Sequence, residues 1–396
     1  MKICFISNLY PPYVIGGAEI CVKREADYLN KIGHKVVIIS SSPDTRLHVE
    51  TLEDIKVYRI GLMNIYSPFS SQSQLTVIKP IYHTINLWSP SAYISIKYIL
   101  KKENPDVVHI HNFKGMSISI FDAVKDLNLP LVFTAHDFSL ICLKASLLKS
   151  SGEICTKPGK LCKLYNHIQN KLINNKPDVV ISPSQFLIDK LRKEGLFENI
   201  IKVRLPLGIE LDDHKPEKNY DTVDIMYVGS LIKNKGVHLL IESFKQIESE
   251  NIRLHIVGKG KEEFELKMLA NSDKRINFHG FKTSVELPDI YRKANVVVVP
   301  SIIYDNSPTV IYESFMAGTP VIGSKIGGIP ELIEDGYNGL LFNTGNLSSL
   351  KLEIQKIVNN IDILKKLEIG AYESSKKYDI KEHVKNLENI YFQIKK

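Results

Sequence analysis

The chain has 396 residues, enough for two or three domains that each enclose a core of their own. Hydrophobic residues make up 44% of it and charged residues 24%, a balance that excludes a disordered protein. Its formal net charge of +7 leaves basic surface for an anionic partner.

The start of the chain, MKICFISNLYPP, predicts a β-strand at 2–7, because its apolar stretch is too short for a signal peptide. No run of residues approaches the roughly 18 apolar positions of a membrane span. Five scattered cysteines favour a reducing compartment over a disulfide framework. We therefore expect a cytoplasmic protein.

Strands and helices alternate in the first half, which predicts a parallel, doubly wound α/β sheet. The expected helices cover 17–32, 92–102 and 116–126, and the expected strands cover 2–7, 35–40, 56–60, 106–110, 130–134 and 178–181. Residues 63–90 break the alternation and contain Trp88, the one tryptophan. A long irregular insertion of this kind is typical of a binding loop.

Gly16 and Gly17 join the first strand to the first helix. Paired glycines let a backbone approach a ligand and leave helix donors exposed, although a tight structural turn would explain the pair equally well. The pattern is not the GxGxxG dinucleotide fingerprint.

Histidines follow two neighbouring strands, His109 and His111 at the end of one and His136 with Asp137 at the end of the next. Adjacent strand ends lie close together, so these side chains could line one wall of a cleft. A metal site is conceivable from the residue types, but the spacing is loose and we predict none. We expect His109 to be a buried structural residue and His136 to be functional.

Between Lys144 and Lys176 seven lysines face one acid, Glu153. The stretch has no arginine, which disfavours nucleic acid as a partner. An anionic membrane surface or a pyrophosphate-bearing acceptor fits it, as does a merely solvated surface. Reduced thiols are favoured over a zinc site in this region, because its cysteines lack CxxC spacing: Cys142, Cys155 and Cys162.

A polar, proline-rich stretch at 205–222 predicts a linker. A second alternating series follows, with expected strands at 224–228, 252–257, 275–278, 295–299 and 320–323, and the chain is predicted to be helical from about 347. Two Rossmann-like domains that face an interdomain cleft are the expected result. We place the first domain at 1–205 and the second at 206–379.

Glycines and lysines follow the first strand of the second series. Gly229 ends that strand, and Lys233 and Lys235 precede Gly236, which we expect to begin a helix. A lysine beside a helix start is a suitable partner for a diphosphate. Gly258 marks a further loop at the same edge of the sheet, beside the base or ribose of a nucleotide.

The segment 300–331, PSIIYDNSPTVIYESFMAGTPVIGSKIGGIPE, follows four consecutive valines that predict a buried strand. Ser307 is expected to cap a helix that Pro308 begins, with the backbone donors of Thr309 and Val310 directed at a phosphate. Asp305 and Glu313 flank this turn and could bind sugar hydroxyls. The segment predicts a protein that uses a nucleotide-activated sugar.

Together these motifs resemble glycosyltransferase family 4, a group of retaining GT-B transferases, over nearly the whole chain. The markers are GGAE at 16–19, PDVVHIHN at 105–112, TAHD at 134–137, YVGSLIKNKG at 227–236, DNSPTVIYESFMAGTPVI at 305–322 and GGIPELI at 327–333. The resemblance implies an acceptor on the N-terminal domain and a nucleotide-sugar donor on the C-terminal one. It also implies that a final helix, about 380–396, crosses back to the first domain.

The resemblance assigns roles to matching positions. Glu313 would hold the ribose, Asp305 the transferred sugar and Lys235 the diphosphate, with His136 near the reacting sugar and Gly16–Gly17 closing over the phosphates. Two positions depart from the family pattern: Asp305 stands where glutamate is usual, and Ser230 where an arginine is common. The second change removes a charge that would stabilise the leaving group.

We therefore predict a metal-independent glycosyltransferase without a cofactor, acting in surface-polysaccharide or glycolipid synthesis, in the cytoplasm and at the inner face of the membrane. A nucleotide-sugar epimerase and a degenerate, non-catalytic scaffold are the alternatives. The predicted catalytic residues are His136, Asp137, Asp305 and Lys235. Three residues are predicted to bind the acceptor: Trp88, His111 and Glu19. The donor-binding set is Gly16, Gly17, Gly229, Ser230, Lys235, Gly258, Asn306, Ser307, Pro308, Thr309, Val310 and Glu313.

Overall fold

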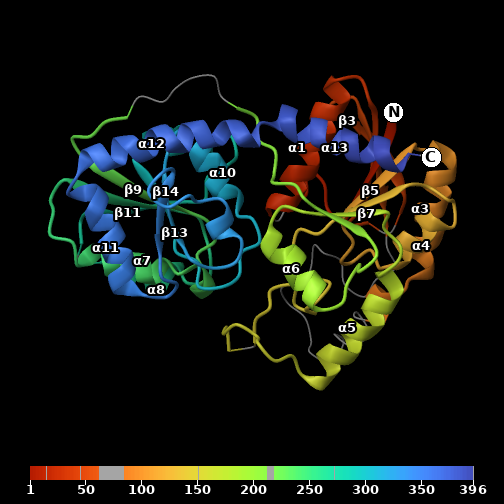
Figure 1. Cartoon of the computed structure of the whole chain (residues 1–396), viewed down its shortest axis with the longest axis horizontal. Helices are drawn as coiled ribbons and strands as arrows, with labels where there is room; N and C mark the ends of the chain where they lie inside the picture. Colours follow the sequence, from red (N-terminus) through yellow and green to blue (C-terminus); the bar gives the residue numbers. More distant parts are fainter. Residues whose placement is uncertain are drawn as a thin grey trace. The chain divides into compact units, whose positions relative to one another are not determined.

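A computed structural model describes residues 1–14, 16–44, 46–61, 84–149, 151–211, 218–271 and 273–395. Most of the predicted insertion at 63–90 and part of the predicted linker lie outside these residues. The chain divides into two compact units (Figure 1). Unit 1 comprises Met1–Leu147, Cys155–Gly208 and Ile380–Lys396, and unit 2 comprises Leu148–Ile154 and Ile209–Asp379.

Unit 1 is built on an eight-stranded sheet in the order β3-β4-β2-β1-β5-β6-β7-β8. All neighbouring strands are parallel except β3, which pairs antiparallel with β4. The strands are β1 (Lys2–Ser7), β2 (Lys35–Ser41), β3 (His48–Leu52), β4 (Ile55–Ile60), β5 (Val107–Asn112), β6 (Leu131–Thr134), β7 (Val179–Ser182) and β8 (Ile201–Arg204).

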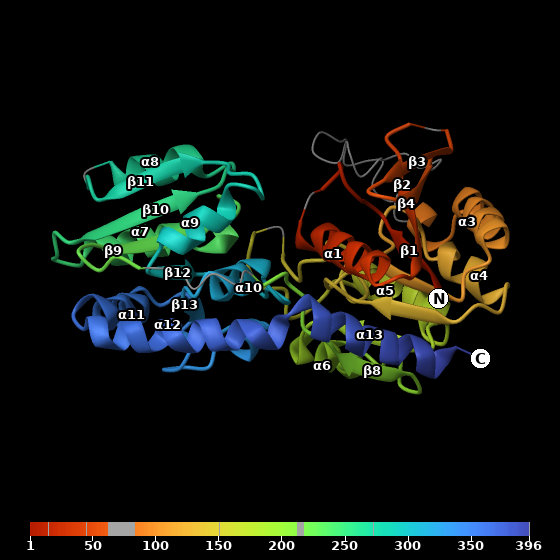
Figure 2. The same cartoon turned by 90° about the horizontal axis from the view of Figure 1, so that it is seen from above.

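The helices of unit 1 are α1 (Gly17–Lys31), α3 (Pro90–Glu103), α4 (Ser119–Lys125), α5 (Lys160–Ile173), α6 (Gln185–Lys193) and α13 (Ile380–Ile394). Helix α1 packs against α13, which comes from the far end of the chain and is drawn in dark blue (Figure 2). Both contribute to one core with the strands, through residues such as Val22, Val384 and Leu387. The C-terminal helix therefore completes the core of unit 1.

Unit 2 is built on a six-stranded parallel sheet in the order β11-β10-β9-β12-β13-β14. The strands are β9 (Val223–Val228), β10 (Ile252–Val257), β11 (Ile276–Gly280), β12 (Val296–Val299), β13 (Val321–Ser324) and β14 (Gly339–Phe342). The helices are α7 (Val237–Lys245), α8 (Glu263–Ala270), α9 (Leu287–Lys293), α10 (Thr309–Met316), α11 (Leu347–Val358) and α12 (Ile361–Ser375).

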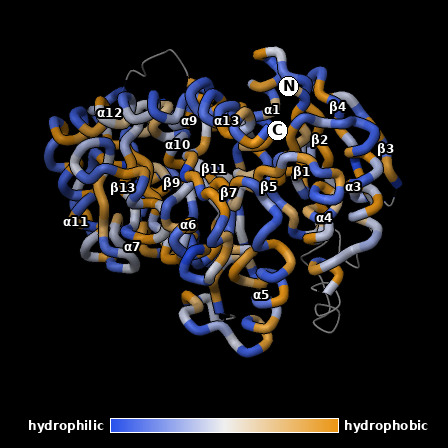
Figure 3. The backbone as a smooth tube through the Cα atoms, turned by 45° about the vertical axis from the view of Figure 1, so that its right-hand side comes forward, coloured by the Kyte–Doolittle hydropathy of each residue, from blue (hydrophilic) through white to orange (hydrophobic). Residues whose placement is uncertain are grey.

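The central strands of both sheets are apolar and appear mainly in orange inside each unit (Figure 3). In both sheets the order reverses beside the first strand, between β1 and β5 in unit 1 and between β9 and β12 in unit 2. Ligands of doubly wound folds bind outside the carboxyl ends of the strands at such a point. The loops after these four strands are therefore the places to look for a site.

No helix among the described residues has both the length and the apolar character to span a membrane.

Candidate functional site

In unit 2, two glycines bring the loops after β9 and β10 into contact. Gly229 has φ +155° and Gly258 has φ +140°, and a Cβ atom on Gly258 would lie 1.9 Å from the carbonyl oxygen of Gly229. Only glycine fits so close an approach. The exposed Ser230 follows in the same loop, and its carbonyl oxygen accepts a hydrogen bond from Tyr227 at 2.8 Å.

An ion pair joins the loops that follow the two strands at the switch point. The Lys235 ammonium lies 2.7 and 2.9 Å from the two carboxylate oxygens of Asp305. Ser301 donates a further bond to Asp305 at 2.5 Å, and the Asp305 carbonyl oxygen accepts from the amide of Gly328 at 2.8 Å. The residues predicted to bind diphosphate and sugar are therefore held against each other, with one further bond to the carboxylate of Asp305 and one to its backbone.

Helix α10 begins one residue later than predicted, at Thr309, because Pro308 has extended backbone angles and is the cap residue. The prediction that Ser307 caps this helix is wrong. Its hydroxyl pairs with that of Tyr312 at 2.6 Å, and no side chain of the described residues caps α10. The first turn therefore presents backbone N–H groups at the carboxyl edge of the sheet, a favourable environment for an anion.

Glu313 lies one turn inside α10, half-buried, and accepts a hydrogen bond from the hydroxyl of Tyr291 at 3.0 Å. Asn306, in the loop before the helix, is 8% exposed. The unit 2 site thus gathers two carboxylates, one ammonium and a helix N-terminus on the loops after β9 and β12 and on α10.

In unit 1, the N-terminus of α1 already holds an acid. Gly17 begins the helix, and the amide of Gly16 donates to Glu19 at 2.7 Å. A carboxylate at this position is stabilised by the helix dipole. Glu19, predicted to bind the acceptor, therefore forms part of the helix start.

The histidines of β5 and the loop after β6 do come together, as the strand order requires. His109 is buried, and its two ring nitrogens lie 2.7 Å from the hydroxyls of Tyr391 and Thr134, which confirms its structural role. His111, 1% exposed, lies 2.9 Å from the half-buried His136. Asp137 accepts a bond from the amide of Ser139 at 2.8 Å.

Two residues beside these histidines were missed. Glu25 on α1 and His383 on α13 are buried and lie 3.0 Å apart, and the carboxylate of Glu25 lies 3.4 Å from His111. They stand 86 residues before and 272 residues after His111, and each sits inside an ordinary amphipathic helix. The sequence offers one signal for these two residues: an ionisable side chain on the apolar face of a helix, where charged residues are rare.

Trp88 is 45% exposed, stacks on Tyr93 and donates a hydrogen bond from its indole nitrogen to Asp122 at 3.1 Å. Cys142, Cys155 and Cys162 are half-buried thiols outside any disulfide. These contacts do not connect Trp88 or the three cysteines with the Lys235–Asp305 pair of unit 2 or with the histidines of unit 1.

Helix α5 exposes three of its apolar side chains and buries two polar ones. Leu161, Leu164 and Ile168 are 82%, 57% and 39% exposed. Asn166 and Gln169 are buried and donate to the carbonyl oxygens of Ile141 and Ser139, at 2.7 and 3.0 Å. This reverses the usual pattern of a surface helix and leaves an apolar stripe among exposed lysines.

Two family models match the chain, "Glycosyltransferase Family 4" over residues 15–212 and "Glycosyl transferases group 1" over 209–374. An uncharacterized glycosyltransferase of Methanocaldococcus jannaschii is 25% identical over 100% of this chain and 99% of its own. A lipopolysaccharide 1,2-N-acetylglucosaminetransferase of Salmonella typhimurium is 32% identical over 45% of this chain and 52% of its own. Among solved structures, HepE of Anabaena in complex with UDP superposes with a TM-score of 0.73 at 17% identity, over 99% of this chain and 100% of that one.

Proposed function

The chain belongs to glycosyltransferase family 4 and has the GT-B fold, and we propose that it takes its sugar from a nucleotide-diphosphate donor. The acceptor is a saccharide or a lipid-linked saccharide, and the sugar keeps its anomeric configuration. Two relationships support this proposal: the kinship with a lipopolysaccharide transferase and the likeness to a fold that holds UDP in HepE. The product belongs to cell-surface polysaccharide or glycolipid.

The observation that carries the proposal is the contact of Lys235 with Asp305, in the loop that leads into α10. Loss of a nucleotide diphosphate builds negative charge on the leaving oxygens, and preorganised positive groups stabilise that charge. The ammonium of Lys235 and the amides of Thr309 and Val310 supply such groups. We expect the transfer to need no divalent metal, so that EDTA leaves the rate unchanged.

The ion pair between Lys235 and Asp305 suggests how donor binding is coupled to sugar binding. A diphosphate competes with Asp305 for the ammonium, which frees carboxylate oxygens to accept bonds from sugar hydroxyls. Both side chains are partly exposed, at 28% and 16%, so the pair can open at modest cost. In this proposal Glu313, which accepts a hydrogen bond from Tyr291, also accepts from the ribose hydroxyls.

The test is a thermal-shift and transfer assay with a panel of nucleotide sugars and the corresponding nucleotide diphosphates. A bound nucleotide raises the melting temperature, since it binds the native state alone. Lys235→Met and Glu313→Gln should abolish that shift, whereas Lys282→Met, which removes only a surface ion pair with Glu286, should not. The absence of nucleotide binding and of turnover in the wild type would refute the proposal.

The same assay separates the alternatives. Conversion of the donor sugar without an added acceptor would identify an epimerase. Nucleotide binding without turnover would indicate a scaffold, to which the departures at Ser230 and Asp305 point. Transfer that requires an acceptor supports the leading proposal.

We further propose that α5 docks the protein on the anionic inner face of the cell membrane. The exposed residues Leu161, Leu164 and Ile168 can enter the headgroup region, and α5 contains no acid that would oppose anionic lipid. Each lysine near such a surface contributes about 1 kcal/mol. Lys160, Lys163 and Lys171 are exposed on the same helix.

Sedimentation with vesicles tests this docking. We expect binding to vesicles that contain phosphatidylglycerol, weaker binding at high salt, and little binding to phosphatidylcholine alone. The double variant L161S/L164S should release the protein. Ile94→Ser, which removes an exposed apolar side chain from α3, is the matched control. Equal binding of both variants would contradict the role of α5.

A further inference from the structure

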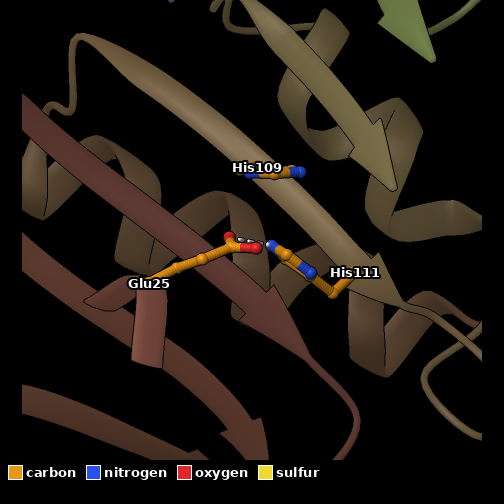
Figure 4. A group of neighbouring side chains, drawn as sticks. All are labelled: Glu25, His109 and His111. Atoms are coloured by element: carbon orange, nitrogen blue, oxygen red, sulfur yellow. Dashed lines mark ion pairs between the residues drawn. The ribbon is translucent and has the colours of Figure 1, made fainter. Parts of the chain in front are cut away.

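Three buried side chains lead to the half-buried His136. The ring of His383 lies 3.0 Å from one carboxylate oxygen of Glu25, and the other oxygen lies 3.4 Å from Nε2 of His111. Nδ1 of His111 then lies 2.9 Å from Nε2 of His136. Glu25 comes from α1 and His111 from β5, with the carboxylate directed at the ring (Figure 4).

The same region offers the ligand atoms of a metal site, since potential donor atoms of Glu25, His109 and His111 lie within 4.8 Å of one another. A metal needs a ring nitrogen with a bare lone pair. Both nitrogens of His109 are engaged by hydroxyls at 2.7 Å. The geometry therefore fits a chain of polar contacts better than a metal centre.

At 3.4 Å the contact between Glu25 and His111 is too long to count as a hydrogen bond. Oε2 of Glu25 and Nε2 of His111 are buried, and neither has a hydrogen-bond partner among the described residues. A buried polar atom left unpaired is costly, so a proton on Nε2 of His111, facing the carboxylate, is the favoured arrangement.

The charges of the chain follow from its surroundings. Burial alone would raise the pKa of Glu25, but hydrogen bonds from His383 and Cys21 hold it below its usual value, so Glu25 is ionised. Burial lowers the pKa of His136, and lowers that of His111 well below its usual value. Both rings are therefore neutral at pH 7.

A neutral imidazole carries one proton, on one of its two nitrogens. The carboxylate of Glu25 draws the proton of His111 to Nε2, which leaves Nδ1 of His111 as an acceptor. That acceptor can pair only with a protonated Nε2 of His136. Nδ1 of His136 is then the nitrogen without a proton.

We propose that Glu25 and His111 are positioning residues that fix the tautomer of His136, so that its Nδ1 can accept a hydrogen bond from a sugar hydroxyl. The role of the acceptor nitrogen rests on the proposed function. The tautomer itself does not, because it follows from contacts inside unit 1. The chain thus assigns a role to Glu25, a buried acid far in sequence from both histidines.

Nuclear magnetic resonance of the full chain, labelled with ¹⁵N only in histidine, reports the tautomer without any substrate. Two-bond ¹H–¹⁵N correlations distinguish a ring protonated at Nε2 from one protonated at Nδ1, and the spectrum of His136→Asn identifies the signals. We expect His136 to be protonated at Nε2 in the wild type. Glu25→Gln and His111→Leu should convert it to a mixture of tautomers. Thr134→Val, which removes only a bond to His109, should leave it unchanged.

Kinetics add a second readout. Glu25→Gln should lower kcat by at least about tenfold, as loss of a tautomer-fixing acid does in other enzymes, while nucleotide binding stays at the wild-type level. A His136 protonated at Nδ1 in the wild type, or a tautomer unaffected by both variants, would overturn the inference. If His136 has the expected tautomer and no sugar transfer occurs, the proposed function is refuted, but the roles of Glu25 and His111 in fixing the tautomer are supported.

Discussion

Gly258 has no room for one additional carbon atom. Its φ of +140° is rare for other residues, and an added Cβ would lie 1.9 Å from the backbone of Gly229. Gly258→Ala should therefore destabilise unit 2 by more than the roughly 1–2 kcal/mol of a left-handed backbone alone. It should also weaken nucleotide binding, because the two loops must move apart. Urea unfolding and the thermal shift measure both effects.

Gly336→Ala is the matched control. Gly336 has φ +80° in the same unit, and nothing lies within 4 Å of an added Cβ atom. It carries the backbone penalty without the collision, so its loss of stability should be smaller and its nucleotide binding normal. Equal losses in both variants would mean that the close approach of the loops is not important.

The buried histidines make unit 1 sensitive to acid. Burial lowers the pKa of His109 and of His111 well below their usual value, whereas both titrate near about 6.5 in an unfolded chain. The unfolded state therefore binds protons first, so stability is present above pH 6.5 and declines below it. Each such group contributes up to about 1.4 kcal/mol per pH unit.

His109→Gln should make this decline shallower between pH 6.5 and pH 5, even if it lowers stability at neutral pH. His48→Gln, at an exposed position on β3, should keep the wild-type slope. Chemical denaturation across this pH range provides the measurement, and parallel slopes in all three proteins would contradict the assignment.

At the scale of elements, the buried and exposed faces of α13 should contribute differently to stability. Leu387 is 1% exposed in the core of unit 1, whereas Phe392 on the same helix is 57% exposed. Leu387→Ala should cost about 2–5 kcal/mol through the cavity it leaves. Phe392→Ala should stay within about 0.5 kcal/mol of the wild type. Denaturant unfolding of the two variants distinguishes them, and similar losses would contradict the packing of α13.

The central strands were predictable because a strand that is buried on both faces consists of consecutive apolar residues. Strands β1, β10 and β12 and helix α1 match their predicted ranges to within a residue. The missed strands lie at or beside sheet edges, where half-exposed residues such as those of β3 and β8 give no apolar run. Strand β14 was missed because it is short and begins at Gly339.

The candidate site was predictable only in its outline. Strand order places Lys235, Asp305 and α10 on one edge, and that much follows from alternating strands and helices. The ion pair between Lys235 and Asp305 and the contact between Ser307 and Tyr312 depend on rotamers that no local pattern encodes. Glu25 was missed because its partners come from β5 and α13, far away along the chain.

At the scale of the whole molecule, the C-terminal residues of the chain stabilise unit 1 and not unit 2. Apart from the short segment Leu148–Ile154, the polypeptide leaves unit 1 at Gly208 and returns to it at Ile380. Gly208 lies so close to α13 that an added Cβ atom would be 2.6 Å from Ile380. Removal of residues 380–396 takes Val384, Leu387 and Tyr391 out of the core of unit 1. The sheet of unit 2 keeps all six strands.

This truncation should therefore unfold unit 1 and leave unit 2 folded. Limited proteolysis followed by mass spectrometry should recover a protected fragment close to 209–379 from the truncated chain and fragments of both units from the full one. Loss of protection in both units would show that they fold as one cooperative block. Protection of unit 1 without α13 would contradict the role of this helix in its core, because no other element of the described chain supplies those apolar side chains.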